Sequence, residues 1–428
     1  MKNIWPPQDQ ILWSSERQGV MPCRKDIHVE VAIVGGGMAG LSAAQEFARQ
    51  GKKVALFEQY ECGSGATGKS SGFVIQNAEL SFTDFSKRYN FEVACKIWDF
   101  IHSGVEDVRN NIVKNNFDCG YTAQNALMVA SDKGALKSFR VEHENLKKGG
   151  YGSRLHDQDG LAQMVDGKGY FGALEYEHTL GMNAYRYCQE MKKLLVSQGV
   201  LIFEETPVTK IDDHYLTTAH ARITADYIVV CVDRFLPDLG VLSQDVYHAQ
   251  NFILASQRLT DEQVSKMFVE ASFMVWDSEL LYNYFRLTSD RRLVLGGSDL
   301  WSTYAATPSR QYDHVIKKIV GTFSRHFPQM KLEFEYVWSG MIGLSKDIGP
   351  IAGADKDFKH VYYIAASAGL PIAAALGRYS AEHLLNGRAD LDEYFSPYRK
   401  FPIGGILQKI LGTKLTFALS NGIKQNIP

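Results

Sequence analysis

The chain has 428 residues, of which 45% are hydrophobic and 22% are charged, and its formal net charge is -2. This balance gives no support to a nucleic-acid partner, and the length exceeds what one hydrophobic core usually serves, so we expect two intertwined domains. The 6 cysteines lack C-x-x-C spacing and the 12 histidines lack metal-ligand spacing, which argues against a disulfide framework and a metal site.

The N-terminal stretch MKNIWPPQDQILWSS carries charged residues and prolines where a signal peptide needs an apolar core. No segment approaches the roughly 18 apolar residues of a membrane-spanning helix. These features predict a soluble, cytoplasmic protein without an integral membrane segment.

Residues 29–59, VEVAIVGGGMAGLSAAQEFARQGKKVALFEQ, have the pattern of a dinucleotide-binding unit: an apolar strand, a G-x-G-x-x-G turn, a helix and a second strand that ends at Glu58. The glycines allow a tight turn, close approach of the backbone to a pyrophosphate, and close packing of helix on strand. The helix N-terminus attracts phosphate, and an acid about 20 residues after the turn binds the ribose hydroxyls. The predicted cofactor contacts are Gly35, Gly37, Met38, Ala39, Gly40, Glu58 and Gln59.

The middle of the chain alternates between predicted helices and strands. After a loop rich in glycine and hydroxyl side chains at residues 62–74, helical spacing over residues 82–116 fits one long helix or two short ones. We expect a strand at 121–130 and helices at 136–148 and 183–199. The apolar run at 228–232 predicts a buried strand that resumes the first sheet.

A second sheet is predicted from strands at residues 251–257, 280–287 and 292–296, and the polar turn TSDRR joins the last two. The segment HVYYIAASAGLPIAAALGRYSAEHLL then has the pattern of a strand followed by a helix and returns to the first sheet. The sequence therefore predicts an α/β protein whose chain passes several times between two sheets.

The stretch LYNYFRL alternates with period two, so that its side chains divide between two faces of a strand. Tyr282, Tyr284 and Arg286 share one face; Leu281, Asn283, Phe285 and Leu287 share the other. The first face has two interpretations, because it could line a substrate pocket or be the wet side of an antiparallel sheet.

Three motifs follow one another along the chain: GGGMAG with Glu58, GATGKSSG at residues 65–72, and LYNYFRLTSDRRLVLGG at residues 281–297. The second is similar to a G-A-S-G-R-N-G-G loop beside a flavin ring, and the third to the Y-Y-F-R-L-T hairpin of putrescine-type oxidases. Up to Leu385 the chain resembles the FAD-dependent D-amino acid oxidase/glycine oxidase family, most of all its gamma-glutamylputrescine oxidase branch.

The resemblance implies a Rossmann-type FAD-binding domain interwoven with an α+β substrate domain built on a mostly antiparallel sheet. The FAD-binding domain would comprise residues 1–115, 182–240 and 338–392, and the substrate domain residues 116–181 and 241–337. Residues 393–428 would form a C-terminal tail.

The resemblance also implies further FAD contacts, which are Gly65, Ala66, Thr67, Gly68, Ser70, Ser71, Gly72, Val208, Gly340, Gly369, Leu370, Pro371 and Ile372. Pro371 suits the first position of a helix, whose free N–H groups would stabilise the negative charge of a reduced flavin. Because no cysteine or histidine stands where a covalent link would be expected, the FAD is predicted to be noncovalent. The candidate catalytic residues are Tyr282, Tyr284, Arg286 and Lys69, although a loop lysine is more often simply solvated.

The sequence also departs from the family. Lys69, Ser70 and Ser71 stand where relatives carry Arg, Asn and Gly, and SAGLP lacks the G-H-G of many relatives. Amino-acid oxidases of the family place an Arg that grips the substrate carboxylate where this chain has Ile342. These differences favour an amine substrate, captured by aromatic faces such as Tyr282, Tyr284 and Trp338.

The expected function is therefore FAD-dependent oxidation of the C–N bond of a small-molecule amine to an imine that hydrolyses. An amino-acid oxidase of the same family is the nearest alternative, kept open by Arg286. A flavin monooxygenase is less favoured, because no second G-x-G-x-x-G unit is found for NAD(P)H. A flavin-binding protein without catalysis, acting as a partner or regulator, is the alternative of another class.

The tail FPIGGILQKILGTKLTFALSNGI predicts an amphipathic helix, because its apolar residues follow i, i+3, i+4, i+7 spacing. They are Ile403, Ile406, Leu407, Ile410 and Leu411. We expect this stripe to dock on the protein's own body or on a sister subunit, in preference to a peripheral membrane contact.

Overall fold

The first of two large sheets has the parallel core that the dinucleotide pattern predicts. The computed structural model describes residues 10–13, 21–279, 281–297, 313–401, 403 and 405–422. The first sheet runs in the order β10-β11-β12-β1-β2-β9, and β19 pairs with β12 and with β18. Its strands are β1 (Ile27–Val34), β2 (Val54–Phe57), β9 (Leu201–Phe203), β10 (Val208–Asp212), β11 (Tyr215–Thr218), β12 (Arg222–Val230), β18 (Ile351–Ala354) and β19 (Val361–Ala365).

Both faces of this sheet are covered, which explains why β1 has no polar alternation over its last residues. Val31 and Ile33 pack in one core with the helix that follows β1, whereas Ala32 and Val34 pack in a second core on the opposite face. The buried strand predicted at residues 228–232 is the end of β12, which pairs in parallel with β1 and β19.

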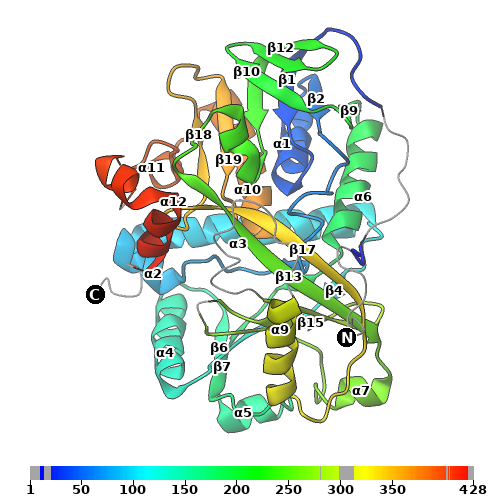
Figure 1. The fold of residues 1–428 in the computed structure, drawn as a ribbon, viewed down its shortest axis with the longest axis vertical. Helices are drawn as coiled ribbons and strands as arrows, with labels where there is room; N and C mark the ends of the chain where they lie inside the picture. Colours follow the sequence, from blue (N-terminus) through cyan, green and yellow to red (C-terminus); the bar gives the residue numbers. More distant parts are fainter. Residues whose placement is uncertain are drawn as a thin grey trace.

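The second large sheet is antiparallel apart from the β5–β14 pair, and runs in the order β17-β13-β16-β15-β14-β5-β7-β6. In Figure 1 it occupies the lower half, and β13 and β17 cross the molecule diagonally below the first sheet. Its strands are β5 (Ala126–Val129), β6 (Ser153–Asp157), β7 (Gly172–Tyr176), β13 (Val246–Arg258), β14 (Met274–Asp277), β15 (Tyr284–Leu287), β16 (Arg292–Gly297) and β17 (Phe334–Ser345). The predicted fold class is confirmed.

The helices cover the two sheets, and a small third sheet joins β3 (Phe73–Val74), β8 (Leu180–Gly181) and β4 (Thr122–Ala123). The helices are α1 (Met38–Arg49), α2 (Phe82–Arg88), α3 (Phe91–Asn115), α4 (Lys133–Lys148), α5 (Gln158–Ala162), α6 (Ala184–Ser197), the 3-10 helix η1 (Asp233–Leu239), α7 (Asp261–Ser265), α9 (Asp313–His326), α10 (Leu370–Asn386), α11 (Asp392–Phe395) and α12 (Gly405–Gly422).

Local capping explains where several elements begin. The helical spacing at residues 82–116 forms two helices, because the Asn90 side chain accepts a hydrogen bond from Val93 N (2.9 Å) and starts α3 anew. The strand predicted at residues 121–130 is divided between β4 and β5.

Other boundaries also differ from the expectation. The strand predicted at residues 280–287 begins only at Tyr284, and position 280 lies outside the described residues. The domain boundary predicted after residue 337 falls inside β17, so the second sheet continues to Ser345.

The C-terminal stripe does not dock on the chain's own body as expected. Ile403 is buried, but Ile406, Leu407 and Ile410 are exposed, so this part of the prediction was wrong. The helix instead turns a polar side chain, Gln408, toward the body.

A buried ion-pair cluster fastens the end of β17 to α2 and to the segment before α12. The Asp347 carboxylate is 1% exposed, accepts hydrogen bonds from Arg399 Nη2 (2.7 Å) and Nε (2.9 Å), and is also bound by Arg88. Burial alone would raise the pKa of Asp347, but the hydrogen bonds and charge of Arg399, together with Arg88, hold it well below its usual range.

We expect Asp347→Asn to lower the free energy of unfolding at pH 7 by about 3 kcal/mol, because the largely buried Arg399 and the partly exposed Arg88 lose their carboxylate. The native pKa is depressed, so the stabilisation is present above the unfolded-state pKa of about 3.9 and is lost as the pH falls through the native value. Denaturant unfolding at pH 7 and at pH values below about 4 measures both effects.

The control is Asp390, an exposed carboxylate that pairs with Arg388. Asp390→Asn should change the free energy of unfolding by less than about 1 kcal/mol. Equal effects of the two substitutions would contradict the importance of the Asp347 cluster.

Candidate functional site

The glycine turn between β1 and α1 is shaped for close approach of a ligand. Gly35 has φ +104°, and a Cβ at this position would lie 2.4 Å from the carbonyl oxygen of Cys231. Gly37 caps α1 without any side-chain hydrogen bond. The positive end of the helix dipole favours an anion here, although the first N–H group of the helix, that of Met38, already donates to the Thr67 hydroxyl.

Glu58 follows β2 and faces this turn. Its Oε2 accepts a hydrogen bond from Gly36 N (2.7 Å), and its Oε1 accepts one from Tyr60 N (2.9 Å). Burial raises the pKa of Glu58, despite these two hydrogen bonds. Each carboxylate oxygen can accept a second hydrogen bond, so the predicted contact with ribose hydroxyls stays a prediction that this geometry permits.

The loop at residues 65–72 joins the two sheets. The Thr67 hydroxyl oxygen accepts a hydrogen bond from Met38 N (3.1 Å) at the start of α1. On the other side, Trp13 Nε1 donates to the carbonyl oxygen of Ser70 (3.0 Å), and Trp338 Nε1 donates to that of Lys69 (3.1 Å). Trp338 is fully buried and holds the loop, so it offers no open face for capturing a substrate.

Arg286 holds the same loop from β15. Its Nε donates to the carbonyl oxygen of Ser71 (2.6 Å) and its Nη2 to that of Met182 (2.6 Å). The side chain is 1% exposed, and burial lowers the pKa of Arg286 to about 10. Its guanidinium also lies 5.8 Å from the ring centroid of Trp13. These contacts hold the loop in place, and the catalytic role of Arg286 stays a prediction.

The helix α10 presents a second positive N-terminus. Gly369 is its N-cap, has φ 113° and makes no side-chain cap hydrogen bond. The helix starts at Leu370, so Pro371 occupies the second position and not the predicted first one. The missing N–H of Pro371 still costs nothing, because none of the first four N–H groups has an intrahelical partner.

A cavity of about 1660 Å³ runs past all of these elements. Ligand pockets commonly measure about 300–1,000 Å³, so this one has room for a dinucleotide and a small substrate. The predicted residues that line it are Gly35, Gly37, Met38, Ala39, Glu58, Gln59, Gly65, Ala66, Thr67, Lys69, Ser70, Ser71, Val208, Tyr282, Tyr284, Gly340, Gly369, Leu370 and Pro371. The lining does not include Gly40, Gly68, Gly72, Arg286 or Ile372.

One part of the cavity wall combines tyrosines with carboxylates. The Tyr282 hydroxyl donates to Glu79 Oε1 (3.1 Å), and the charge of Glu79 together with burial raises the pKa of Tyr282 well above its usual value. The rings of Tyr282 and Tyr284 lie 6.0 Å apart. Asp277 and Glu279 line the cavity as well. Tyr284 and Arg286 are buried, so this strand face is not solvated; Tyr282 and Tyr284 line the cavity, whereas Arg286 does not.

The sequence analysis missed Asp233, which follows β12 and joins the two sheets at the cavity wall. Its Oδ2 accepts a hydrogen bond from Gly343 N (2.7 Å) in β17, and its Oδ1 accepts one from Ala366 N (2.9 Å). Burial raises the pKa of Asp233. An acid directly after a buried parallel strand was the available signal, because ligand sites lie at such strand ends.

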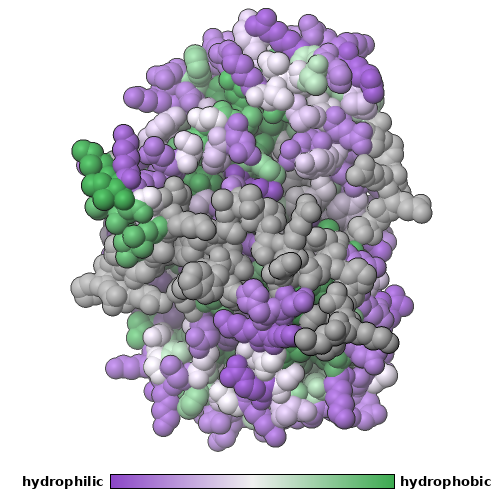
Figure 2. All heavy atoms as spheres, in the orientation of Figure 1, coloured by the Kyte–Doolittle hydropathy of each residue, from purple (hydrophilic) through white to green (hydrophobic). Residues whose placement is uncertain are grey.

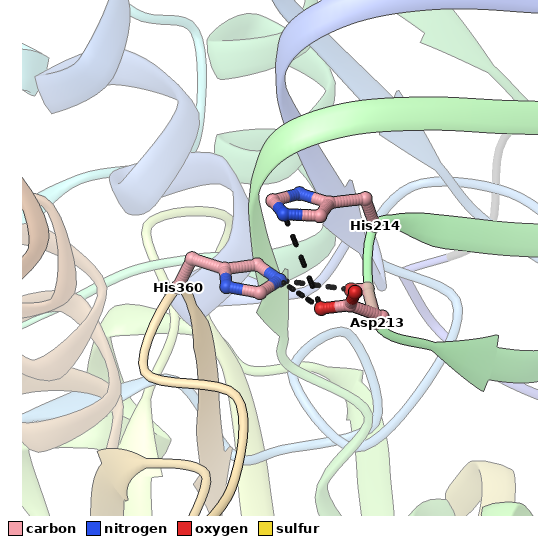
Figure 3. A group of neighbouring side chains, drawn as sticks. All are labelled: Asp213, His214 and His360. Atoms are coloured by element: carbon pink, nitrogen blue, oxygen red, sulfur yellow. Dashed lines mark hydrogen bonds and ion pairs between the residues drawn. The ribbon is translucent and has the colours of Figure 1, made fainter.

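Sequence spacing predicted no metal site, yet the structure brings Asp213, His214 and His360 together (Figure 3). The imidazole rings of the two histidines stack with centroids 3.9 Å apart and an interplanar angle of 6°. Ring nitrogens bind metals in the ring plane, and two parallel planes do not converge on one ion. None of the three side chains lines the cavity, so we assign no metal to this group.

Comparison with known proteins agrees with this architecture. The family described as FAD dependent oxidoreductase (DAO) matches residues 30–383. The chain is 26% identical over 408 residues to the probable oxidoreductase OrdL of Haemophilus influenzae, an alignment that covers 91% of this chain and 90% of that protein. It is 26% identical over 398 residues to the gamma-glutamylputrescine oxidoreductase of Escherichia coli, with 90% of each chain covered.

Solved structures show the same fold. The L-proline dehydrogenase of P. horikoshii superposes with a TM-score of 0.74 at 18% identity, covering 87% of this chain and 98% of that one. The glycine oxidase of Geobacillus kaustophilus superposes with a TM-score of 0.73 at 18% identity, covering 88% of this chain and all (100%) of that one.

The residues present fit an FAD molecule. The turn at Gly35 packs too closely on the Cys231 carbonyl to admit a Cβ, and the N-termini of α1 and α10 both line the cavity. The Glu58 carboxylate stands beside the turn. Together with the family match over most of its length, this geometry leads to one conclusion: the chain belongs to the DAO family of FAD-dependent oxidoreductases.

Proposed function

We propose that the protein oxidises the C–N bond of an amine, using noncovalently bound FAD. The observation that carries this proposal is the group of carboxylates on the cavity wall beside Tyr282 and Tyr284. An ammonium group would be attracted both by Glu79, Asp277 and Glu279 and by the faces of the two rings.

The wall formed by β17 supports an amine over a simple amino acid. Ile342 and its neighbour Met341 line the cavity with apolar side chains where a carboxylate would need a donor. A carboxylate left unpaired in a desolvated site would lose several kcal/mol of binding free energy. Arg286, the candidate for binding a substrate carboxylate, already donates to the carbonyl oxygens of Ser71 and Met182.

The side chains of the protein would bind and orient the amine, while bound FAD supplies the acceptor for a hydride from the carbon next to nitrogen. The amine is captured as a cation and must lose a proton before the hydride leaves. Glu79 Oε1, which accepts a hydrogen bond from the Tyr282 hydroxyl, would receive that proton. The substrate then becomes an imine, which water hydrolyses to a carbonyl compound and an amine or ammonia.

A second candidate, oxidation of a substrate that carries a carboxylate, is favoured by one observation. Arg234 lines the cavity and its guanidinium lies 3.8 Å from the ring centroid of Phe235. A planar guanidinium is the side chain best suited to binding a carboxylate through two hydrogen bonds. Names of similar proteins include a gamma-glutamylputrescine oxidoreductase and a glycine oxidase, so they leave both substrate classes open.

One prediction of this proposal concerns the cofactor. Acid precipitation of the purified protein should release FAD into the supernatant, and the pellet should keep no flavin. Gly35→Ala should abolish FAD binding, because the new Cβ would meet the carbonyl oxygen of Cys231 at 2.4 Å and the backbone has φ +104°. The matched control is Gly51→Ala, which also has a positive φ (+79°) but open space around it. Flavin that stays in the pellet, or FAD retained by Gly35→Ala, would refute this cofactor site.

The second prediction concerns the substrate. Under anaerobic conditions, diamines and N-substituted amines should bleach the flavin absorbance faster than glycine, sarcosine or D-alanine. Glu79→Gln should raise the half-saturating amine concentration about tenfold, which corresponds to about 1.4 kcal/mol. The exposed acid Glu393 does not line the cavity, and Glu393→Gln should leave this concentration unchanged.

If a small amino acid reduced the flavin rapidly and Arg234→Met abolished this reduction, the amine assignment would be wrong. Arg234 would then bind the substrate carboxylate. If no amine or amino acid reduces the flavin, the noncatalytic flavin-binding alternative gains support instead.

The third prediction separates two roles of Arg286. Arg286→Lys should weaken FAD binding at least about tenfold, because one ammonium cannot reach the carbonyl oxygens of both Ser71 and Met182, and buried carbonyls would lose their donors. With FAD saturating, the half-saturating substrate concentration should stay within about twofold of the wild-type value. Arg292→Lys is the matched control on the neighbouring strand, where Arg292 binds the carbonyl oxygen of Ser256 (2.8 Å), and it should not affect FAD affinity. An Arg286→Lys protein with normal FAD affinity but poor saturation by substrate would show that Arg286 binds substrate.

A further inference from the structure

The helix α12 presents its apolar side chains to solvent. Ile406 is 78% exposed, Ile410 is 75% exposed and Leu407 is 52% exposed. After a break in the helix, Leu415 (49% exposed) and Leu419 (41% exposed) continue this row of exposed apolar side chains. Figure 2 shows a green patch on the left edge of the molecule, where Figure 1 places α12. We call these five residues the apolar face of α12.

The side of α12 that contacts the body is held by polar bonds. Gln408 is 6% exposed, and its Nε2 donates to the carbonyl oxygen of Gln244 (2.8 Å) while its Oε1 accepts from Lys346 Nζ (3.0 Å). Lys346 also donates to the carbonyl oxygen of Ile403 (3.0 Å) and pairs with Asp245 (2.7 Å). A helix that packs for stability buries its apolar stripe and exposes its polar face, so α12 has the reverse orientation.

Charge points to the kind of surface that would cover this face. From Ser396 to the end, the sequence contains no Asp or Glu, and it contains Arg399, Lys400, Lys409, Lys414 and Lys424. Lys409 lies between Ile406 and Ile410 in the sequence and is exposed, as is Lys400. Apolar side chains flanked by lysines without acids are typical of helices that lie in the interface of an anionic bilayer.

The geometry favours lying on a membrane over crossing it. Gly412 has φ 73° and ψ 166°, so α12 is divided into two short helical segments. Among the helices of the described residues, none combines the length and apolar character that crossing a bilayer requires. The contacts of Gln408 also fasten the first segment of α12 to the body of the protein.

We propose that the apolar face of α12 docks on the surface of an anionic lipid bilayer and makes the enzyme a peripheral membrane protein. Leu344 and Ile348, which line the cavity, stand two residues on either side of Lys346, which binds α12. The anchor is therefore attached directly to one wall of the cavity. The proposal does not rest on the identity of the substrate.

The test is co-sedimentation of the full-length, FAD-loaded protein with vesicles of phosphatidylcholine, with or without phosphatidylglycerol. The protein should pellet with the anionic vesicles, and added salt should weaken binding because the lysine contribution is screened. The double variant Ile406→Ser/Ile410→Ser should reduce the bound fraction at least about tenfold, because two apolar side chains no longer enter the bilayer. An unchanged flavin spectrum would show that the variant is folded.

The matched control is Val113→Ser/Val196→Ser, which removes two exposed apolar side chains from other helices (65% and 53% exposed) and should bind vesicles normally. Failure of the wild-type protein to bind anionic vesicles, or equal binding by the α12 double variant, would overturn the proposal. A lipid-free dimer that Ile406→Ser/Ile410→Ser converts to monomers would also overturn it, since a second copy would then cover this face.

Discussion

The structure depends on one constraint: the loop at residues 65–72 must be held against two sheets at once. Thr67 fastens it to the start of α1, Trp338 and Arg286 fasten it to the second sheet, and Trp13 of the N-terminal segment also donates to one of its backbone carbonyls. The glycine turn at Gly35 belongs to the first sheet and the tyrosine wall to the second. A single loop bonded to both fixes how these two parts of the cavity wall face each other.

Burying the guanidinium of Arg286 to hold a loop costs desolvation free energy. The number and arrangement of its hydrogen-bond donors explain why an arginine stands here. A planar cation with several donors can satisfy backbone carbonyls from separate segments, which in this structure are Ser71, Met182 and Leu287. Burial lowers the pKa of Arg286, because desolvation disfavours its charged form. The same bonds occupy the Nε and Nη2 donors of Arg286, and the side chain does not line the cavity.

The cavity wall combines helix N-termini with carboxylates. The N-termini of α1 and α10 carry partial positive charge, and the carboxylates of Glu79, Asp277 and Glu279 line the wall beside Tyr282. The C-terminal helix α12 contacts the body of the protein through a polar side chain, Gln408, and its apolar face stays exposed. A stripe of apolar residues thus shows that a helix is amphipathic, but not which side faces the protein.

Local sequence determined much of this protein by itself. The strand, glycine turn, helix and Glu58 were predictable because backbone conformation and hydrophobic period depend on neighbouring residues, and the period-two face of Tyr284 and Arg286 followed from strand geometry. Tertiary structure alone decided what those side chains meet. Asp233 binds β17 and the segment after β19, Arg286 meets Ser71 and Met182, and three carboxylates line one wall, all through contacts between residues far apart in the chain. Such contacts leave no periodic signal, because the order of strands in the sheets, and not the spacing of residues, brings them together.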